Sequence, residues 1–239
     1  KEVLDELGAD TTGSSFLEPD GTFPNHIPNP ENKDAMKAIC DATVAAGADL
    51  GLIFDTDVDR MSAVLSDGTP INRDSIIAMI AAILAPDYPG STIITDSVTS
   101  DRLTDFLEND LGLKHLCYMR GYKNVINKCK ELNAEGIISP LAMETSGHGC
   151  LKENYYLDDG AYLAVKLVIA VAKAKREGKT IDHFIANLCT EYADREVRFP
   201  ILTDDFHAYG TSVLETFKKR ALPVSYTHLR AHETVLDLV

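Results

Sequence analysis

The stretch Asp49-Leu-Gly-Leu-Ile-Phe-Asp55-Thr-Asp57-Val-Asp59-Arg60 places three carboxylates at alternate positions directly after an apolar run. Alternate residues of an extended or tightly turned segment project to the same side. Three like charges on one side repel one another unless a cation lies among them. A hard divalent cation with oxygen ligands, Mg2+ above all, meets this need. The stretch therefore predicts a buried strand that ends in a metal-binding loop.

Two other interpretations of the acidic loop carry less weight. A calcium-binding EF-hand needs glycine at the sixth position of its loop and glutamate at the twelfth, but counting from Asp55 these positions hold Arg60 and Ser66. That spacing excludes an EF-hand. A solvated acidic turn would need no cation, but Leu50 and Phe54 anchor this loop to a core.

A phosphatase of the haloacid-dehalogenase type remains an alternative. Such enzymes place a nucleophilic aspartate and an acid/base aspartate two residues apart after an apolar strand. Asp55 would then be the nucleophile and Asp57 the general acid, with Lys152 and Asp158–Asp159 as later parts of the site. The simpler interpretation of the later pair is that Asp159 caps the long helix that follows.

Composition bounds the class of protein. The 239 residues are 45% hydrophobic and 25% charged, which is ordinary for a globular chain that can bury cores. The net charge of -14 argues against a general binder of nucleic acid or of anionic membranes. No apolar run approaches the roughly 18 residues of a membrane span. The five cysteines are scattered and form no CxxC pair, which favours a reducing, cytoplasmic setting.

Periodicity and turn residues predict alternating strands and helices along the chain. Expected strands cover 11–17, 50–54, 61–65, 92–95, 115–118, 136–141 and 196–202. Expected helices cover 1–7, 33–46, 74–84, 100–109, 123–132, 159–176, 181–192 and 205–220. We therefore expect an α/β fold of two consecutive βαβ-type three-layer domains with mixed, mostly parallel sheets.

The ends of the chain and its middle carry boundary signals. Pro86-Asp-Tyr-Pro89-Gly90 breaks two patterned regions and predicts a domain junction. The chain begins at Lys1 with no methionine or signal-like stretch, so we expect a fragment that lacks its N-terminus. Residues 225–239 resemble a translated vector tail, and we expect them to pack poorly, with Leu229 and Val235 outside any core.

A second motif, Met143-Glu144-Thr145-Ser146-Gly147-His148-Gly149, combines a carboxylate, a hydroxyl and an imidazole on a loop that glycine makes flexible. Such groups suit sugar hydroxyls, and loops at the carboxyl ends of strands bind ligands in open α/β sheets. A polar turn without a ligand is the alternative.

A third motif, Arg120-Gly121-Tyr122-Lys123, places two cations at a predicted helix start. The helix dipole and free N–H groups at such a terminus favour phosphate. Cations at this position are often merely solvated, so this motif supports a phosphate site only in combination with the other motifs.

Together these motifs resemble the α-D-phosphohexomutase superfamily, which includes phosphoglucomutases and phosphomannomutases. Asp55–Arg60 resembles its metal loop, DGDGDR, and Glu144–His148 its sugar loop, GE(x)SGH. Asp20–Glu31 resembles the segment ahead of the second-domain helix, and Arg120–Lys123 falls where the family has a G-x-K or G-H element. The motifs follow family order over most of residues 1–221.

The resemblance implies four domains around one cleft, which supply a phosphoserine, the metal loop, the sugar loop and a phosphate clamp. By analogy, residues 1–88 form the second domain, 89–196 the third, and 197–224 the linker and start of a truncated fourth. No T-A-S-H-N-P-like or R-x-S-G-T-like stretch is found in the sequence. We therefore expect the first and fourth domains of the same polypeptide as missing partners, and little activity without them.

The chemistry implied by the resemblance is reversible phosphoryl transfer through a phosphoserine, with hexose phosphate and hexose bisphosphate as ligands. Mg2+ would be held by Asp55, Asp57 and Asp59 and would neutralise charge on the transferring phosphoryl group. The resemblance assigns catalytic positions to Arg60, Lys123 and His148, and substrate-binding positions to Arg120, Glu144 and Ser146.

The sequence departs from the family pattern at four positions. Thr56 and Val58 replace glycines of the metal loop, and Met143 replaces the glycine before the glutamate. Tyr122 stands where some members have histidine, which puts an acid/base role there in doubt. A non-catalytic sugar-phosphate-binding module therefore stays open beside the mutase and the phosphatase.

Overall fold

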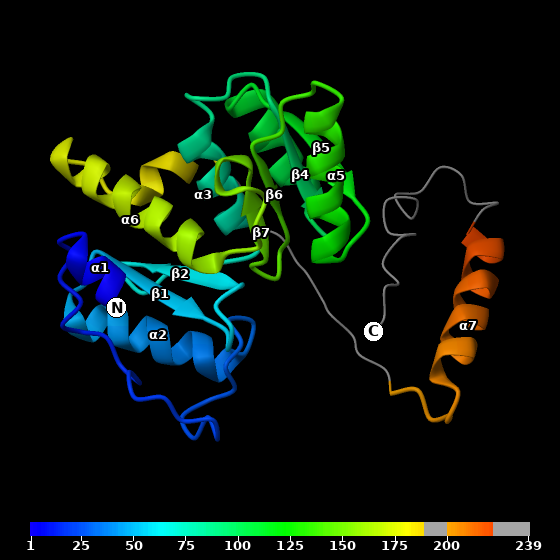
Figure 1. Cartoon of the computed structure of the whole chain (residues 1–239), viewed down its shortest axis with the longest axis horizontal. Helices are drawn as coiled ribbons and strands as arrows, with labels where there is room; N and C mark the ends of the chain where they lie inside the picture. The colour runs from blue at the N-terminus through cyan, green and yellow to red at the C-terminus, as the bar shows by residue number, and fades with distance from the viewer. Residues whose placement is uncertain (189–199, 222–239) are drawn as a thin grey trace. The chain divides into compact units, whose positions relative to one another are not determined.

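The computed structural model describes residues 1–188 and 200–221, in two compact units that cover 1–188 and 189–239. The first unit is built on two β-sheets with helices on their faces (Figure 1), which confirms the expected α/β class. It begins with a short helix, α1 (Glu2–Glu6). The second unit contributes one described helix, α7 (Phe206–Ala221). Within these described residues, no helix has the length and apolar character needed to cross a membrane.

The first sheet carries the acidic loop on a hairpin. Its strands are β1 (Leu50–Phe54), β2 (Met61–Leu65) and β3 (Pro70–Ile71), in that order. All its pairings are antiparallel, unlike the mostly parallel pairing expected. Phe54 lies opposite Met61 in the register, so Asp55–Arg60 is the connection between β1 and β2. The loop is therefore held at both ends by paired strands.

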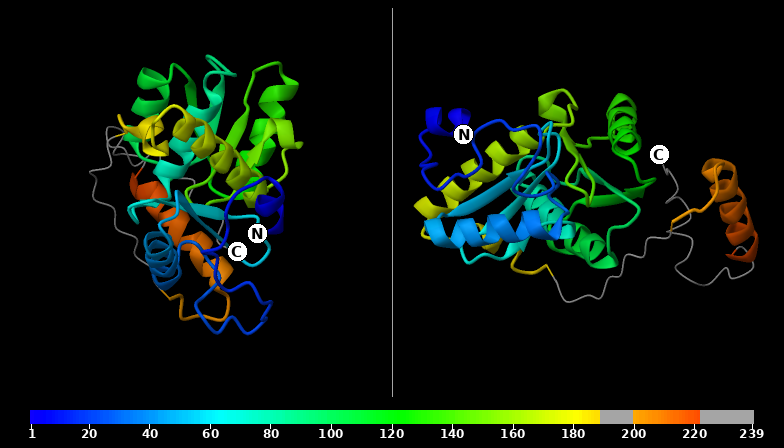
Figure 2. Two further views of the ribbon diagram at one scale, coloured as in Figure 1. Left: turned by 90° about the vertical axis from the view of Figure 1, so that its left-hand side faces the viewer. Right: turned by 90° about the horizontal axis from the view of Figure 1, so that it is seen from below.

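Helices cover both faces of this sheet. Figures 1 and 2 show α2 (Lys33–Ala46) on one face and α6 (Gly160–Arg176) on the other. The predicted bounds of α2 are confirmed. Its N-cap Asn32 accepts hydrogen bonds from the N–H groups of Asp34 and Ala35 with its side-chain oxygen, and Gly47 ends it in a left-handed conformation.

The second sheet has strand order β5-β4-β6-β7 and is mixed, as expected. Its strands are β4 (Thr92–Asp96), β5 (Lys114–Tyr118), β6 (Leu141–Met143) and β7 (Gly149–Leu151). The central strand β4 pairs parallel with β5 and β6, and β6 pairs antiparallel with β7. One face packs on α5 (Tyr122–Ala134); the other faces α3 (Asp74–Leu84), α4 (Asp101–Asp105) and the π-helix η1 (Phe106–Asp110).

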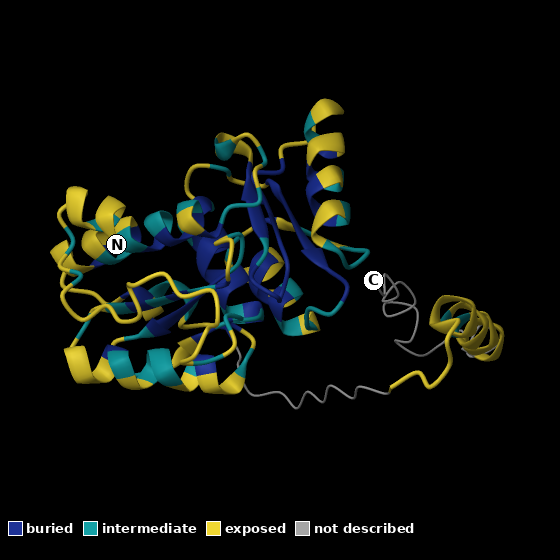
Figure 3. Cartoon of the chain, turned by 60° about the horizontal axis from the view of Figure 1, so that its bottom comes forward, coloured by how far each residue is buried: buried dark blue, intermediate teal, exposed yellow. Residues whose placement is uncertain are grey.

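One hydrophobic core joins the two sheets. It contains Met61 of β2, the apolar residues of α3, Ile93 of β4, Leu141 of β6 and Leu163 of α6. The four single residues are at most 1% exposed. Helix α3 is almost entirely buried, as its apolar sequence predicted. In Figure 3 the strands of the second sheet are coloured mostly as buried. The two sheets therefore share common apolar contacts.

Several predicted elements differ in the structure. The strand expected over 11–17 is wrong, because this segment forms turns and Phe16 has a φ of 57°. The strand expected over 136–141 is also wrong. Gly136 turns the chain with a φ of 85°, and the strand that pairs with β4 begins only at Leu141. The short strands β3 and β7 were not predicted.

The C-terminal predictions are only partly described. The helix expected over 181–192 begins as the 3-10 helix η3 (Ile181–Ile185), and residues 189–192 lie outside the described residues. Of the strand expected over 196–202, residues 200–202 form no strand, and the rest lies outside the described residues. The tail 225–239, with Leu229 and Val235, lies outside them as well.

Candidate functional site

The acidic loop is closed by its own arginine. Arg60 donates from its backbone N–H to Oδ1 of Asp55 at 3.1 Å and from Nε to Oδ2 at 2.7 Å. The Asp55 side chain is only 2% exposed. Burial acts to raise the pKa of Asp55, but the hydrogen bonds and charge of Arg60 outweigh it and leave that pKa below its usual value. Asp55 is thus an ionised group that fixes the loop's shape.

The three loop carboxylates converge as predicted. Asp55, Asp57 and Asp59 each place an oxygen within 4.8 Å of the others, and Val58 between them takes a φ of 67°. Within residues 1–188 and 200–221, the buried Oδ1 of Asp59 has no hydrogen-bond partner. Burial raises the pKa of Asp59 to about 6, with Asp55 adding to the rise and His148 opposing it. Oδ1 of Asp59 lies 3.9 Å from Nε of Arg60. An oxygen-only donor set with a buried oxygen that lacks a hydrogen bond within the described residues fits a hard cation such as Mg2+.

The predicted sugar-binding motif Glu144–His148, called the sugar-type loop below, forms the connection between β6 and β7. Its ends are joined by a hydrogen bond of 2.8 Å from the N–H of Glu144 to the carbonyl of His148. Glu144 is 3% exposed; its Oε1 accepts from the N–H of Gly121 at 2.6 Å, and its Oε2 from the hydroxyl of Ser146 at 3.3 Å. Burial raises the pKa of Glu144, although the Gly121 hydrogen bond opposes it. Glu144 and Ser146, two of the three predicted substrate-binding residues, are therefore held by hydrogen bonds.

A small polar cavity lies beside this loop. It has a volume of about 80 Å³ and is lined by Pro30, Glu31, Ser62, Asn72, Arg73, Thr145 and Ser146. The first two residues end the proline-rich segment Asp20–Glu31, so that segment reaches the same region as the sugar-type loop.

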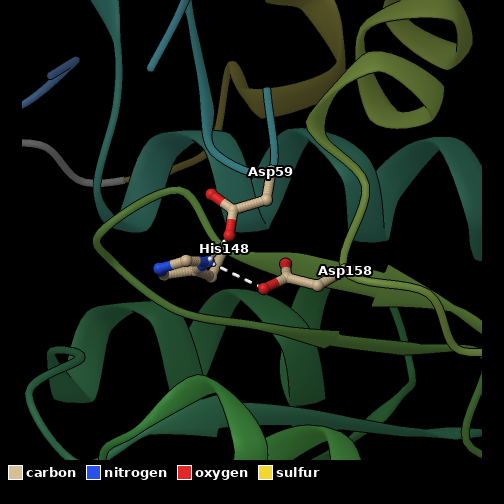
Figure 4. A group of neighbouring side chains, drawn as sticks. All are labelled: Asp59, His148 and Asp158. Carbon is tan, nitrogen blue, oxygen red and sulfur yellow. Dashed lines mark hydrogen bonds and ion pairs between the residues drawn. The ribbon is translucent and has the colours of Figure 1, made fainter. Parts of the chain in front are cut away.

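His148 forms a pair with Asp158 (Figure 4). Its Nδ1 lies 2.8 Å from Oδ2 of Asp158 and 3.6 Å from Oδ2 of Asp59. Burial acts to lower the pKa of His148, but the hydrogen bond and charge of Asp158, with Asp59, outweigh it and raise that pKa. The other oxygen of Asp158 accepts from the N–H of Gly149 at 3.0 Å.

These three side chains also meet the geometric condition for a metal site, since one ligand atom of each lies within 4.8 Å of the others. An imidazole with a raised pKa between two carboxylates already balances their charge. We therefore interpret Asp59, His148 and Asp158 as a histidine–carboxylate group rather than as a second metal centre. The neighbouring Asp159 is the N-cap of α6, as predicted: its Oδ1 accepts a hydrogen bond of 2.9 Å from the N–H of Tyr162.

Backbone contacts join the acidic loop Asp55–Arg60, called the metal-type loop below, to the sugar-type loop. Arg60 and His148 form an antiparallel bridge, and the N–H of Met61 donates to the carbonyl of Gly147 at 3.4 Å. Gly160 donates its N–H to the carbonyl of Val58 at 3.1 Å. A Cβ at Gly160 would lie 2.8 Å from that oxygen, so glycine is needed for this approach. The two motifs, far apart in sequence, thus form one site.

The start of α5 contributes the remaining predicted residues. Arg120, 40% exposed, places Nε 3.9 Å from Oδ2 of Asp96. Asp96 is fully buried and accepts from the hydroxyl of Thr145 at 2.9 Å; burial, with the charge of Glu144, raises its pKa to about 6. Arg120 is therefore connected to the sugar-type loop through a buried carboxylate.

Lys123 is exposed, and its Nζ lies 5.7 Å from the ring centroid of Tyr122. The Tyr122 ring in turn stacks on His148, with centroids 4.8 Å apart and an angle of 19° between the planes. The structure thus places Lys123 next to Tyr122, and Tyr122 against the imidazole.

Asp96 is the residue of the site that was not predicted. Tyr122 and Asp158 belong to motifs named from the sequence, but their contacts with His148 were not predicted. Asp96 follows the apolar strand β4 as Asp55 follows β1, so the same pattern of an acid at a strand end could have revealed it. Asp158 had a simpler explanation as part of a helix start. Its contact with His148 depends on a bridge between Cys150 and Asp158, which no local pattern predicts.

Comparison with known proteins assigns both sheets to one family. The sequence model of phosphoglucomutase/phosphomannomutase α/β/α domain II matches residues 1–68, and that of domain III matches residues 72–192. The chain is 32% identical over 181 residues to a phosphomannomutase/phosphoglucomutase of Pseudomonas putida, covering 75% of this chain and 38% of the relative. It is 30% identical over 204 residues to that of Pseudomonas aeruginosa, covering 85% and 42%.

A crystal structure agrees. That of a phosphoglucomutase/phosphomannomutase family protein from Burkholderia thailandensis superimposes with a TM-score of 0.64 at 29% identity, over 74% of this chain and 36% of the other. The chain therefore spans about two fifths of the length of the curated relatives described above. From these matches, the chain belongs to the phosphoglucomutase/phosphomannomutase family and carries the family's second and third α/β/α domains.

Proposed function

We propose that this chain supplies the Mg2+-binding and hexose-binding loops of a phosphohexomutase. The reaction is the interconversion of hexose 1-phosphate and hexose 6-phosphate through a phosphoserine and a hexose bisphosphate. The proposal rests on the backbone pairing of Arg60 with His148. This pairing places three carboxylates suited to a cation beside a loop whose side chains suit sugar hydroxyls. Family membership supports the same reaction class.

The residues of the metal-type loop have separate roles in this proposal. Asp55, Asp57 and Asp59 would hold Mg2+, which neutralises charge on the transferring phosphoryl group. Arg60 keeps the Asp55 carboxylate in place through its two hydrogen bonds, and its positive charge lies at the phosphate end of the site.

The sugar-type loop would read the hexose. The Glu144 carboxylate, whose two oxygens already accept from Gly121 and Ser146, would accept from sugar hydroxyls through its remaining lone pairs, and the Ser146 hydroxyl can donate or accept. Because neighbouring hydroxyls can exchange places, this recognition survives reorientation of the bisphosphate. Arg120, half-exposed and held at Asp96, would bind the phosphate that is not being transferred.

His148 would move a proton at its Nε2 atom, since Nδ1 is occupied by Asp158. The hydrogen bond and charge of Asp158 raise the pKa of His148, which favours the protonated imidazole. Lys123, beside Tyr122, is the second candidate for charge stabilisation.

The phosphatase alternative fits the geometry less well. A nucleophilic carboxylate must present a free oxygen to phosphorus, but both oxygens of Asp55 accept hydrogen bonds from Arg60, and the side chain is 2% exposed. This arrangement favours Asp55 as a metal ligand and loop anchor.

The rest of the proposed enzyme lies outside the described site. The phosphoserine and the phosphate clamp would come from first and fourth domains of the same polypeptide. The boundaries at 88/89 and 196/197, and the start of a fourth domain within 197–224, stay predictions. A cytoplasmic setting is proposed from the free thiols of Cys40, Cys117, Cys129 and Cys150.

Calorimetric titration with Mg2+ tests the cation site. We expect the chain to bind Mg2+ and Asp57→Asn to weaken binding by about tenfold or more, because one anionic ligand becomes neutral. The matched control Asp87→Asn removes an exposed carboxylate outside the loop and should leave affinity unchanged. Removal of Mg2+ with EDTA should restore the apo state. Equal affinities of Asp57→Asn and wild type would refute the assigned cation site.

Titration with glucose 1-phosphate tests the sugar site. We expect Glu144→Gln to weaken binding by about three- to tenfold, since a charged acceptor is lost while the Gly121 hydrogen bond is kept. Glu135→Gln, at an exposed position, is the control. Hexose-phosphate binding without turnover in a longer chain that includes all the domains would favour a non-catalytic module instead.

A further inference from the structure

Tyr122 occupies an unusual position at the start of α5. It is 37% exposed, so burial of its ring does not explain the residue. Its ring nevertheless lies nearly parallel to the imidazole of His148, with 4.8 Å between centroids and 19° between planes. Stacked aromatic rings attract each other beyond the area that they bury.

The imidazole would have freedom to turn without this contact. Its backbone is held by the bridge to Arg60, and Nδ1 is held by Asp158 at 2.8 Å. A single hydrogen bond to Nδ1 leaves the tilt of the ring about that bond undetermined. The Tyr122 ring lies against a face of the imidazole and therefore fixes its plane. If the imidazole is protonated, the cation also interacts favourably with the phenol face.

The same turn also holds the other end of the sugar-type loop. Gly121, the residue before Tyr122, donates its N–H to Oε1 of Glu144 at 2.6 Å. Adjacent residues of one turn thus contact Glu144 through the backbone and His148 through a ring. A hydrogen bond of 2.8 Å from Nδ2 of Asn124 to the carbonyl of Arg120 also stabilises this turn.

We propose that Tyr122 is a positioning residue: its ring sets the plane of His148 so that the Nε2 edge faces a bound hexose phosphate. The proposal rests on the proposed function, in which the Glu144–His148 loop binds that ligand. The ring face, rather than the phenol hydroxyl, does the positioning.

Two substitutions separate the ring from the hydroxyl. Tyr122→Phe keeps the stacking ring, and Tyr122→Leu keeps an apolar side chain without it. NMR spectra of the His148 ring protons report the stack through the ring current of Tyr122, and titration with glucose 1-phosphate reports binding. Tyr155→Leu is the control, because Tyr155 is 83% exposed.

We expect Tyr122→Phe to keep the His148 ring shifts and to change affinity by less than about twofold. Tyr122→Leu should move both ring-proton signals and weaken binding by about three- to tenfold, in line with the loss of one aromatic pair. The amide spectrum of α2, on the far sheet, should be unchanged in both variants and so reports that they fold. Tyr155→Leu should resemble wild type in every measurement.

Two results would overturn the positioning role. One is a Tyr122→Leu variant with unchanged His148 signals or unchanged affinity. The other is a Tyr122→Phe variant that loses as much affinity as Tyr122→Leu, since the hydroxyl would then be the active group. Failure of the wild-type chain to bind glucose 1-phosphate would instead overturn the proposed function, while the His148 signals would still show whether Tyr122 stacks on the imidazole.

Discussion

Arg60 and His148 pair through their backbones, so the residue that closes the metal-type loop lies beside the residue that ends the sugar-type loop. The adjacent hydrogen bond between Met61 and Gly147 extends the contact. Each loop connects two strands of its own sheet, and the bridge links the two hairpins. A displacement of one loop must therefore displace the other or break this bridge.

The close approach at Gly147 should be intolerant of a side chain. Gly147 has a φ of 100°, and a Cβ there would lie 2.6 Å from the carbonyl oxygen of Met61. We expect Gly147→Ala to lower the free energy of unfolding by about 3 kcal/mol, through both backbone strain and this clash. Urea denaturation measures the change.

Gly136→Ala is the matched control for that prediction. Gly136 has a φ of 85°, and nothing lies within 4 Å of a Cβ added there. Its cost should be the backbone strain alone, about 1 kcal/mol. Equal losses at the two positions would mean that the approach of Gly147 to Met61 contributes nothing to the cost.

Asp158 should control the protonation of His148. Its hydrogen bond and charge are the main causes that raise the pKa of His148 against burial. We expect Asp158→Asn to lower that pKa, so that less imidazolium is present at pH 7, as followed by the His148 ring protons in an NMR pH titration. Asp159→Asn, which alters the adjacent helix cap, should have a smaller effect. An unchanged titration in Asp158→Asn would contradict the pairing.

His115 should make the chain less stable in mild acid. Its ring nitrogens lie 2.7 Å from the Thr95 hydroxyl and 2.8 Å from the Thr104 hydroxyl, and burial lowers its pKa from 6.5 to about 4. Because the unfolded chain binds the proton first, stability present above pH 6.5 is lost as the pH falls toward 4.

The loss attributable to His115 is at most about 3 kcal/mol. His115→Gln keeps a hydrogen-bonding side chain that does not titrate. Urea unfolding of wild type and variant at pH 7 and pH 4 should show a smaller loss in the variant. The comparison cancels the opposite contribution of Asp96, whose raised pKa favours the folded state at low pH. Parallel losses in the two proteins would refute the assignment.

Local signals in the sequence were enough to place the helices and strands whose ends carry clear capping or turn residues. Asn32 and Gly47 bound α2, and the apolar run 50–54 followed by acids bounds β1, so both were predicted to the residue. The run 137–143 is apolar throughout most of its length, and only pairing of Leu141 with Ile93 decides where β6 begins. The antiparallel first sheet follows from the β1–β2 hairpin; strands 50–54 and 61–65 were predicted as consecutive elements, but their antiparallel pairing was not.

The same distinction holds for the site. Asp55, Asp57 and Asp59 are neighbours in sequence, so their convergence could be predicted from their spacing. Asp158 reaches His148 and Asp96 reaches Thr145 only through strand and hairpin pairings. The family resemblance suggests the roles of the loops, whereas the stack of Tyr122 on His148 depends on how the fold brings α5 to the β6–β7 loop.

The core shared by the two sheets bears on how these domains could be exchanged between relatives. Met61 lies in the range of the first family domain, and Ile93, Leu141 and Leu163 lie in the range of the second. A chimera that grafts one domain onto a foreign partner would bring together side chains never selected to fit each other. Successful recombination would therefore require transfer of matching apolar residues from both matched ranges, 1–68 and 72–192, or repacking of the core after the swap.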